Sequence, residues 1–356
     1  MQYLRIRLYP FLFSFFFVGA IMAWIVSSTV QFSTGQRLEE RGKDSVSELL
    51  QEYRKLSHSG TSDAERITKY EEWRQLLLAV VRDNPSSESN KEALREVVRI
   101  CNALGDDDQS LRLLEELMTD ETISLWEHYE LQMQHAGVSH QRFMINYRTS
   151  EEECVGVVNS YAKSNELLDS LLRDTSSVPH FIEVTEDGRQ HELLPVDQLT
   201  EQRIIILAQS GNVINALGGK SESLSRSAKN YFRQARERLD EWGTPRANLM
   251  VMGLDLEHLA SNEALAAAYA GDVQDAYAAL RFLNTLKNKR WPTSFYVEDV
   301  ALRAFMEKGK EPRDFLTTWI EQNEDDERTA LLVTRITDSF MKERPDGYLE
   351  LGFAYK

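Results

Sequence analysis

Cysteine is scarce in this chain, and its scarcity excludes two kinds of stabilising site. Cys101 and Cys154 are the only two cysteines among the 356 residues. They lie far apart and neither belongs to a C-x-x-C pair, so the sequence encodes no disulfide framework and no zinc knuckle. Two buried free thiols are the simpler expectation, because unpaired cysteine is among the most often buried residue types. A single disulfide in an oxidising compartment is the alternative.

Basic side chains are too few to balance the acidic ones. The 57 acidic against 41 basic side chains give a formal net charge of −16. A charge of this sign repels polyphosphate and anionic lipid headgroups at long range, unless a local patch of the surface is basic. We therefore expect no nucleic acid among the partners.

Motifs that carry catalysis or cofactor binding are also missing. The chain contains no H-E-x-x-H zinc pattern and no G-x-S-x-G nucleophile elbow. Residues 218–221 read Gly-Gly-Lys-Ser, but a phosphate-binding loop needs its first glycine six residues before the lysine, where Ile214 stands. The glycines are better explained as the end of a helix, with Ser221 as the cap of the next one. No carboxylate pair is distinguished as catalytic, so we expect no enzyme activity, no metal and no cofactor.

One long run, from Leu8 to Val30, contains no charged residue. At about 1.5 Å per residue, a helix of this length crosses a hydrocarbon core of about 30 Å. The run therefore predicts a single membrane-spanning helix. The apolar residues expected to face lipid are Leu8, Phe11, Phe13, Phe15, Phe16, Phe17, Ile21, Trp24, Ile25 and Val26.

The charges around this run favour a cytoplasmic N-terminus. Arg5 and Arg7 lie close to its start, whereas the first charged residue after Val30 follows only several residues later. The C-terminal body is then extracytoplasmic, in the periplasm of a bacterial cell. The alternative is a cleaved signal peptide with Val26-Ser27-Ser28 as its small-residue site, although the run is longer than the apolar region of such a peptide.

A polar helix is predicted directly after the span, over residues 36–56. Val46, Leu49, Tyr53 and Leu56 follow a 3-4-3 spacing, which is the seam of a short coiled coil. This stalk either packs on the body of its own chain or forms a homodimer. Residues 57–61, with Gly60, indicate a hinge.

Residues that typically begin or end helices recur from Ser62 almost to the end of the chain. Ser62 to Glu65 and Ser89 to Glu92 each match a capping box, and Gly105 and Gly137 are expected to end helices. The expected helices cover 62–84, 89–104, 106–118, 121–136, 150–172, 198–217, 221–242, a segment from Thr244 onward, 262–270, 272–286, 296–308, 312–322 and 327–342.

One segment departs from this helical pattern. Residues 181–184 and 190–194 flank Asp187-Gly188, a dipeptide that accepts the positive φ angles of a tight turn and so predicts a β-hairpin. The hairpin is either a connection folded over the helices or an edge to which a partner adds a strand.

Two helical hairpins resemble tetratricopeptide (TPR) repeats, which combine an apolar first helix, a Gly-Asp turn and a small residue early in the second helix. The better match, residues 94–118, has its turn at Gly105-Asp106 and its small residue at Ser110; its apolar positions are Leu94, Val97, Cys101, Leu114 and Leu117. The other, residues 260–286, carries Ala264, Ala267, Gly271-Asp272, Ala276, Leu280 and Leu283. It departs from the motif at Glu263, where a large apolar residue is usual, and at Tyr269, which lies too close to the glycine. The resemblance covers about 50 residues and implies stacked hairpins that share one core.

The family binds ligand peptides in a groove lined by the first helices of the repeats. On the better repeat, the corresponding positions are Glu92, Arg95, Arg99 and Asn102. Arg95 and Arg99 share a helix face at i, i+4 spacing, where two guanidinium groups could bind a ligand carboxylate. Arginines paired with nearby carboxylates of the same chain are the alternative.

The sequence as a whole predicts an all-α, TPR-like helical-hairpin solenoid with one short β-hairpin insertion, preceded by a single transmembrane helix. The expected divisions are a cytoplasmic tail and anchor (1–34), a stalk and hinge (35–61), N-terminal repeats (62–174), the hairpin insertion (175–197) and C-terminal repeats (198–356). Such a protein would serve as a membrane-anchored scaffold that binds proteins or peptides, as an accessory subunit of a bacterial envelope complex. The alternatives are a cleaved, secreted TPR-like protein and an extracytoplasmic solute-binding or hydrolytic protein on an α/α scaffold. The solute-binding or hydrolytic alternative would need carboxylates or aromatic residues, such as Trp291, Tyr296 and Trp319, clustered in a deep pocket.

Overall fold

The computed structural model describes the greater part of the chain after the predicted anchor. It covers Val46, Leu50, Gln51 and Tyr53, and then residues 63–84, 89–147, 150–179, 181–184, 190–243, 249, 252–306 and 313–322. The predicted span at 8–30, the hinge at 57–61, the helix start at Thr244 and the helix at 327–342 lie outside these residues. Within them, no helix is both long and apolar enough to cross a membrane.

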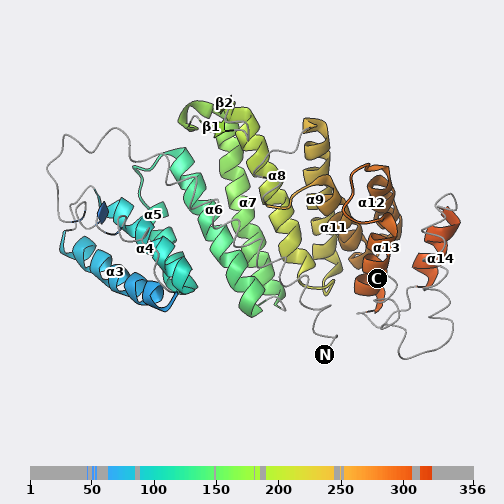
Figure 1. Ribbon diagram of the computed structural model, residues 1–356, viewed down its shortest axis with the longest axis horizontal. Coiled ribbons are helices and arrows are strands. Elements are labelled where there is room, and N and C mark those ends of the chain that lie inside the picture. The colour runs from blue at the N-terminus through green and yellow to red at the C-terminus, as the bar shows by residue number, and fades with distance from the viewer. Residues whose placement is uncertain are drawn as a thin grey trace. The chain divides into compact units, whose positions relative to one another are not determined.

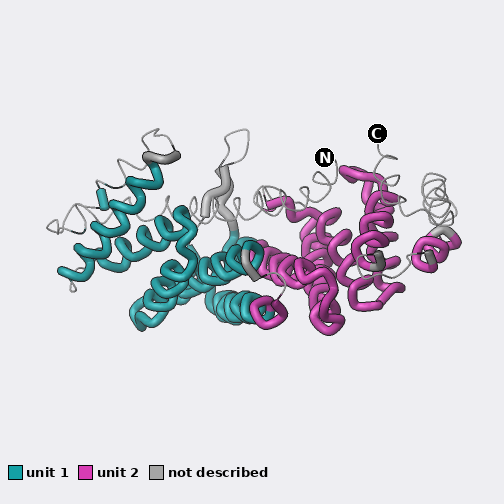
Figure 2. The backbone as a smooth tube through the Cα atoms, turned by 90° about the horizontal axis from the view of Figure 1, so that it is seen from below, with its two compact units in different colours: residues 1–147, 155–199 teal, residues 148–154, 200–356 magenta. Residues whose placement is uncertain are grey.

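The described chain is all-α apart from one pair of short strands, and it divides into two compact units (Figures 1 and 2). Unit 1 comprises residues 1–147 and 155–199, and unit 2 comprises residues 148–154 and 200–356. Before residue 200 the helices are α3 (Asp63–Asp83), α4 (Asn90–Leu104), α5 (Asp107–Met118), α6 (Leu125–Arg142) with a π-helical turn (Phe143–Tyr147), α7 (Glu151–Arg173), a 3₁₀ turn (Thr175–Ser177) and the start of α8 (Pro195–Asn215). After α8 they are α9 (Glu222–Trp242), α11 (Leu256–Tyr269), α12 (Val273–Thr285), α13 (Thr293–Ala301), a second π-helical turn (Leu302–Met306) and α14 (Arg313–Gln322).

Helices of unit 1 pack against their neighbours in chain order, α3 on α4, α4 on α5 and α5 on α6. Packing of consecutive helices is the arrangement of a helical solenoid, in which each hairpin buries its apolar face only against the next. At the α4–α5 turn Gly105 adopts φ 73°, and Asp106 caps α5 by accepting a hydrogen bond from the Gln109 amide at 3.2 Å. The turn expected from Gly105-Asp106 is therefore confirmed.

The residues described from the predicted stalk pack on the body of the chain. Val46, Leu50 and Tyr53 are helical and buried in the same hydrophobic cluster as Trp73 and Leu77 of α3. The Tyr53 and Trp73 rings meet edge to face, with centroids 5.7 Å apart. This packing favours a stalk bound to its own body, because Val46 and Tyr53 would otherwise form the seam of the predicted homodimer.

Several helix boundaries differ from the expectation. Ser89 makes no side-chain cap on α4, whereas a complete capping box forms at Ser124 and Glu127 of α6. Gly137 does not end α6, which continues to Arg142. The buried neighbours Ala136 and Val138 hold this part of the helix in the core, and their burial outweighs the weak helix propensity of one glycine.

In unit 2 likewise, Ser221 makes no side-chain cap on α9. Helix α11 begins at Leu256 rather than at Asn262, because the Asp255 carboxylate accepts a hydrogen bond from the His258 amide at 2.7 Å. The cap at Asp255 was not recognised in the sequence.

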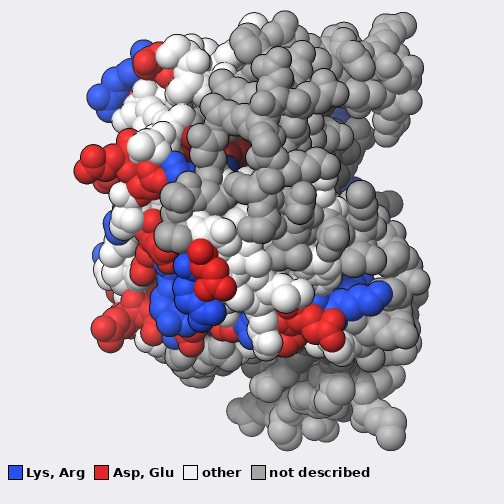
Figure 3. Space-filling model, turned by 90° about the vertical axis from the view of Figure 1, so that its left-hand side faces the viewer, with Lys and Arg blue, Asp and Glu red and all other residues white. Residues whose placement is uncertain are grey.

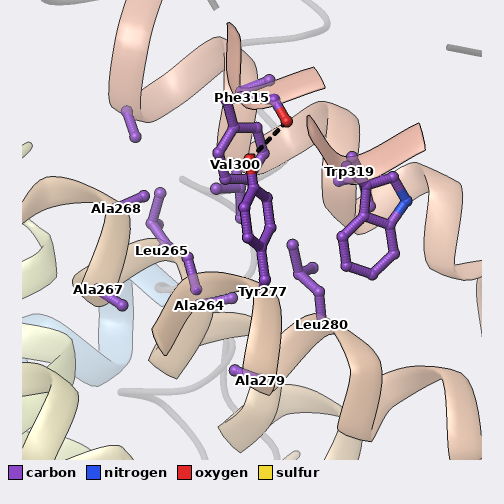
Figure 4. Close-up of a cluster of buried hydrophobic side chains, with 14 of the residues drawn as sticks. Ala264, Leu265, Ala267, Ala268, Tyr277, Ala279, Leu280, Val300, Phe315 and Trp319 are labelled. Carbon is purple, nitrogen blue, oxygen red and sulfur yellow. Dashed lines mark hydrogen bonds between the residues drawn. The ribbon is translucent and has the colours of Figure 1, made fainter. Parts of the chain in front are cut away.

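The core of unit 2 combines small residues on α11 and α12 with large ones on α14 (Figure 4). Tyr277 donates a hydrogen bond to the Phe315 carbonyl at 2.7 Å, and its ring stacks on that of Phe315 with centroids 4.9 Å apart. Glu263 is 1% exposed and accepts from Arg233 at 2.9 Å and from Arg236 at 2.7 Å. These two ion pairs explain why a carboxylate can stand where the repeat motif has an apolar residue.

Two four-residue strands, β1 (Phe181–Val184) and β2 (Gln190–Leu193), pair antiparallel within the segment where the sequence predicts a hairpin. The register places Phe181 opposite Leu193 and Val184 opposite Gln190. The predicted turn between them, at Asp187-Gly188, lies outside the described residues. Cys101 and Cys154 are free and buried, so the expectation of two unpaired thiols is confirmed.

Candidate functional site

The candidate site is the face of α4 that carries the four residues expected to bind a partner. Helix α4 buries one side in the core of unit 1, through residues that include Val97, Val98 and Cys101. The opposite side leaves partly exposed the side chains Glu92, Arg95, Arg99 and Asn102. All four side chains are therefore accessible from solvent.

The two arginines are engaged by carboxylates of unit 1. Arg95 donates from Nη2 to Oε1 of Glu127 on α6 at 2.9 Å, and Arg99 donates from Nη1 to Oε1 of the buried Glu96 at 2.8 Å. Asn102 accepts a hydrogen bond from Ser110 on α5 at 2.6 Å. Arg95 and Arg99 therefore follow the second expectation from the sequence: they pair with carboxylates of the same chain instead of leaving both guanidinium groups free for a ligand.

Glu127 joins this face to the start of α6. Its carboxylate accepts a hydrogen bond from the Ser124 amide at 2.9 Å as well as the one from Arg95. Burial alone would raise the pKa of Glu127, but the hydrogen bonds from Ser124 and Arg95 outweigh it and lower the pKa. Glu127 therefore stays ionised, and it connects the cap of one helix to the exposed face of another.

Glu130, one turn further along α6, is a residue of this site that the sequence analysis missed. Burial raises the pKa of Glu130 to about 7, although the positive charge of Arg95 and a hydrogen bond with Trp126 act in the opposite direction. The only sequence signal was its i, i+3 spacing from Glu127 on a helix that also carries Trp126.

Together, Glu96, Glu127 and Glu130 set three carboxyl groups beside the two guanidinium groups of α4. We call these five residues the α4–α6 charged face. The space-filling view toward the side on which α3 lies likewise shows Lys and Arg side chains directly beside Asp and Glu (Figure 3). A face of this kind can recognise a charged peptide by exchanging internal ion pairs for external ones.

Comparison with models of protein families gives no match for this chain. Comparison with curated protein sequences gives none either. The similarity to tetratricopeptide repeats accordingly rests on the two hairpins themselves.

The residues expected to face lipid, from Leu8 to Val26, all lie outside the described part of the chain. Among the described residues, no three His, Cys, Asp or Glu side chains are grouped so that they could hold a metal ion.

The three aromatic residues considered for a solute pocket lie in different surroundings within unit 2. Trp319 is buried in the core, with its ring centroid 5.9 Å from that of Tyr277. Trp291 is 52% exposed and stacks on Phe295, with centroids 5.2 Å apart. Tyr296 donates a hydrogen bond to the buried Glu257. Burial, followed by this hydrogen bond, raises the pKa of Tyr296. Trp319 is thus part of the hydrophobic core of unit 2, Tyr296 packs against that core, and Trp291 is half exposed.

Glu257 organises the loop that carries Trp291. Its carboxylate accepts hydrogen bonds from the backbone amides of Arg290, at 2.9 Å, and of Trp291, at 3.2 Å. The carboxylate lies in the first turn of α11, so it fixes the α12–α13 loop to that helix. These contacts of Glu257 stabilise the fold of unit 2.

Proposed function

We propose that this chain is a membrane-anchored scaffold that binds proteins or peptides, as an accessory subunit of a bacterial envelope complex. The observation that carries the proposal is the α4–α6 charged face. It lies on α4, the first helix of the TPR-like hairpin at 94–118, and on α6, which packs on the second helix of that hairpin, α5. In a solenoid of hairpins such a face is continuous from one hairpin to the next and suits an extended partner. The resemblance of residues 94–118 and 260–286 to tetratricopeptide repeats supports the same function.

The anchor and the location of the body belong to the proposal too. The uncharged run from Leu8 to Val30 supports a single span. Arg5 and Arg7 beside it support an extracytoplasmic body. The packing of Val46 and Tyr53 on α3 supports a short connection, because only about a dozen residues separate the predicted anchor, which ends at 34, from Val46, the first residue that the structure describes. A fully extended chain of that length spans about 40 Å at most.

Partner recognition at the α4–α6 charged face would rest on charge rather than on apolar area. The ion pairs of Arg95 and Arg99 are only partly exposed, so a partner that replaced their carboxylates would gain charge-assisted hydrogen bonds. Such exchanges contribute more to specificity and association rate than to affinity. The face therefore suits a reversible partner.

A photocrosslinking experiment tests the proposed face. A photoreactive amino acid is placed at Ala103, an exposed residue four positions after Arg99, so that both arginines are kept. The matched control places it at Glu116, an exposed residue of α5. In native membranes, irradiation should give protein adducts at position 103 but not at 116, and the change Arg95→Ala/Arg99→Ala should abolish them. Adducts that were the same at both positions, or that survived the double change, would contradict the proposed face.

A further inference from the structure

The end of α12 and the loop that joins it to α13 are basic, unlike the chain as a whole. Residues 281–292 contain four basic side chains and no acidic one, whereas the whole chain carries a net charge of −16. Arg281, Lys287 and Arg290 are exposed, and Lys289 is partly exposed. With Trp291 they form what we call the basic tryptophan patch.

Contacts within the fold hold the indole of this patch in place. The two amide hydrogen bonds to Glu257 fix the backbone at Arg290 and Trp291, and the Trp291 ring lies on Phe295 with an interplanar angle of 24°. Pro292 follows directly and leads into α13. A large aromatic side chain that is half exposed yet already ordered loses little conformational entropy when it binds.

Most of the positive charge of the patch is not neutralised inside the fold. Arg290 pairs with Asp255 at 2.5 Å and with Glu257 at 3.5 Å. Arg281 donates instead to the neutral Gln322, and Lys289 donates to Thr293 and to the Asn284 carbonyl. Among the residues that the structure describes, no carboxylate pairs with Arg281, Lys287 or Lys289. Three cations close in sequence to the exposed indole thus have no paired carboxylate in the described part of the chain.

We propose that the basic tryptophan patch docks on the anionic headgroup surface of a bilayer. The inference rests on the proposed function, because the anchor would keep the body near the bilayer. Tryptophan favours the membrane–water interface, where the ring is desolvated and the indole N–H stays hydrated. Lysine and arginine beside it are attracted by anionic lipids.

So small a patch can bind the bilayer only because the predicted anchor already holds the chain at the membrane. Three cations and one indole give only a weak contact for a free protein in solution. The anchor turns docking into an intramolecular step with a high effective concentration of membrane. An acidic peptide would meet the same cations, but it would not require an exposed indole next to them in the chain. These two features together favour the lipid surface.

The test uses the full chain in lipid nanodiscs with a fluorophore beside the patch. Both native cysteines are buried and free, so a polarity-sensitive dye can be attached selectively after Asn288→Cys. The matched control is Asn230→Cys, an equally exposed asparagine on α9. We expect a blue shift at position 288 in discs that contain phosphatidylglycerol, no shift in phosphatidylcholine discs, and no shift at position 230. The change Arg281→Glu/Lys287→Glu should remove the shift, and so should about 1 M salt, which shortens the screening length to about 3 Å. Trp291→Ala should weaken it.

Three other results would overturn the inference. They are equal emission in both kinds of disc, an equal shift at position 230, and a shift produced by polyglutamate added to phosphatidylcholine discs but not by phosphatidylglycerol. The third would assign the patch to an acidic protein segment. Each of these leaves the proposed scaffold intact as long as the chain co-purifies with the discs. A chain that failed to enter discs at all would instead contradict the anchor.

Discussion

Gly211 occupies a position on α8 where a side chain has no room. A Cβ atom built there would lie 2.6 Å from two ring atoms of the fully buried Phe232. We expect Gly211→Ala to lower the free energy of unfolding by about 1–3 kcal/mol, the usual cost of overpacking a core. The matched control is Gly156→Ala on α7, where nothing lies within 4 Å and alanine should stabilise the helix by about 0.5–1 kcal/mol. Urea unfolding measures the free energy of unfolding of both variants, which should fall for Gly211→Ala and rise for Gly156→Ala. Equal changes in the two variants would show that α8 and α9 do not approach so closely.

Glu130 makes stability depend on pH near neutrality. Its pKa is about 7 in the folded chain against 4.5 for the ordinary carboxyl, chiefly because burial disfavours the charge. The folded state therefore binds the proton more tightly, and the resulting stability is fully present below pH 4.5 and is lost as pH rises through about 7. At about 1.36 kcal/mol per pKa unit, the loss is on the order of 3 kcal/mol.

The variant Glu130→Gln should remove most of this dependence. Relative to wild type, its urea midpoint should rise between about pH 5 and pH 8.5, whereas that of Glu166→Gln, an exposed change on α7, should not. A Glu130→Gln curve parallel to that of wild type would show that the carboxyl titrates normally.

At the scale of single residues, the sequence predicted on which face of a helix a residue lies better than it predicted which residue pairs with it. Helical spacing placed Arg95 and Arg99 on the exposed face of α4, because the period of a helix separates its buried side from its exposed side. It could not identify Glu127 as the partner of Arg95, since the two lie 32 residues apart and meet only through packing of α6. Glu263 was noticed as a departure from the repeat pattern, but its ion pairs with Arg233 and Arg236 depend on the position of α9.

At the scale of elements, sequence signals predicted the existence of the helices better than their ends. Asn84 and Gly105 follow the last residues of α3 and α4 as expected, because asparagine before proline and glycine both terminate helices locally. Gly137 was expected to end α6 and does not, because burial of its neighbours outweighs propensity. The early start of α11 depends on Asp255, a favoured N-cap residue type that was overlooked because aspartate is frequent in this acidic chain.

The stalk is the element whose packing is most directly testable. Val46, Leu50 and Tyr53 each bury an apolar side chain, so loss of the stalk should destabilise α3 by several kcal/mol, at about 1.5–3 kcal/mol for each residue. A chain lacking residues 1–56 should exchange its α3 amide hydrogens faster than a chain lacking only residues 1–45. Both should sediment as monomers. Equal exchange, together with a dimer formed only by the longer chain, would assign the seam to a homodimer.

At the scale of the whole molecule, the proposed protein is one tethered scaffold, made of a predicted anchor, a short connection and two helical units. Its central claim is that the α4–α6 charged face binds its partner at the membrane. The deciding measurement repeats crosslinking from position 103 in native membranes with the full chain and with a chain lacking residues 1–35, and identifies the adducts by mass spectrometry. The account predicts a defined set of envelope proteins joined to the full chain only, and lost with Arg95→Ala/Arg99→Ala. Adducts absent from the full chain, or identical in the two chains, would contradict it.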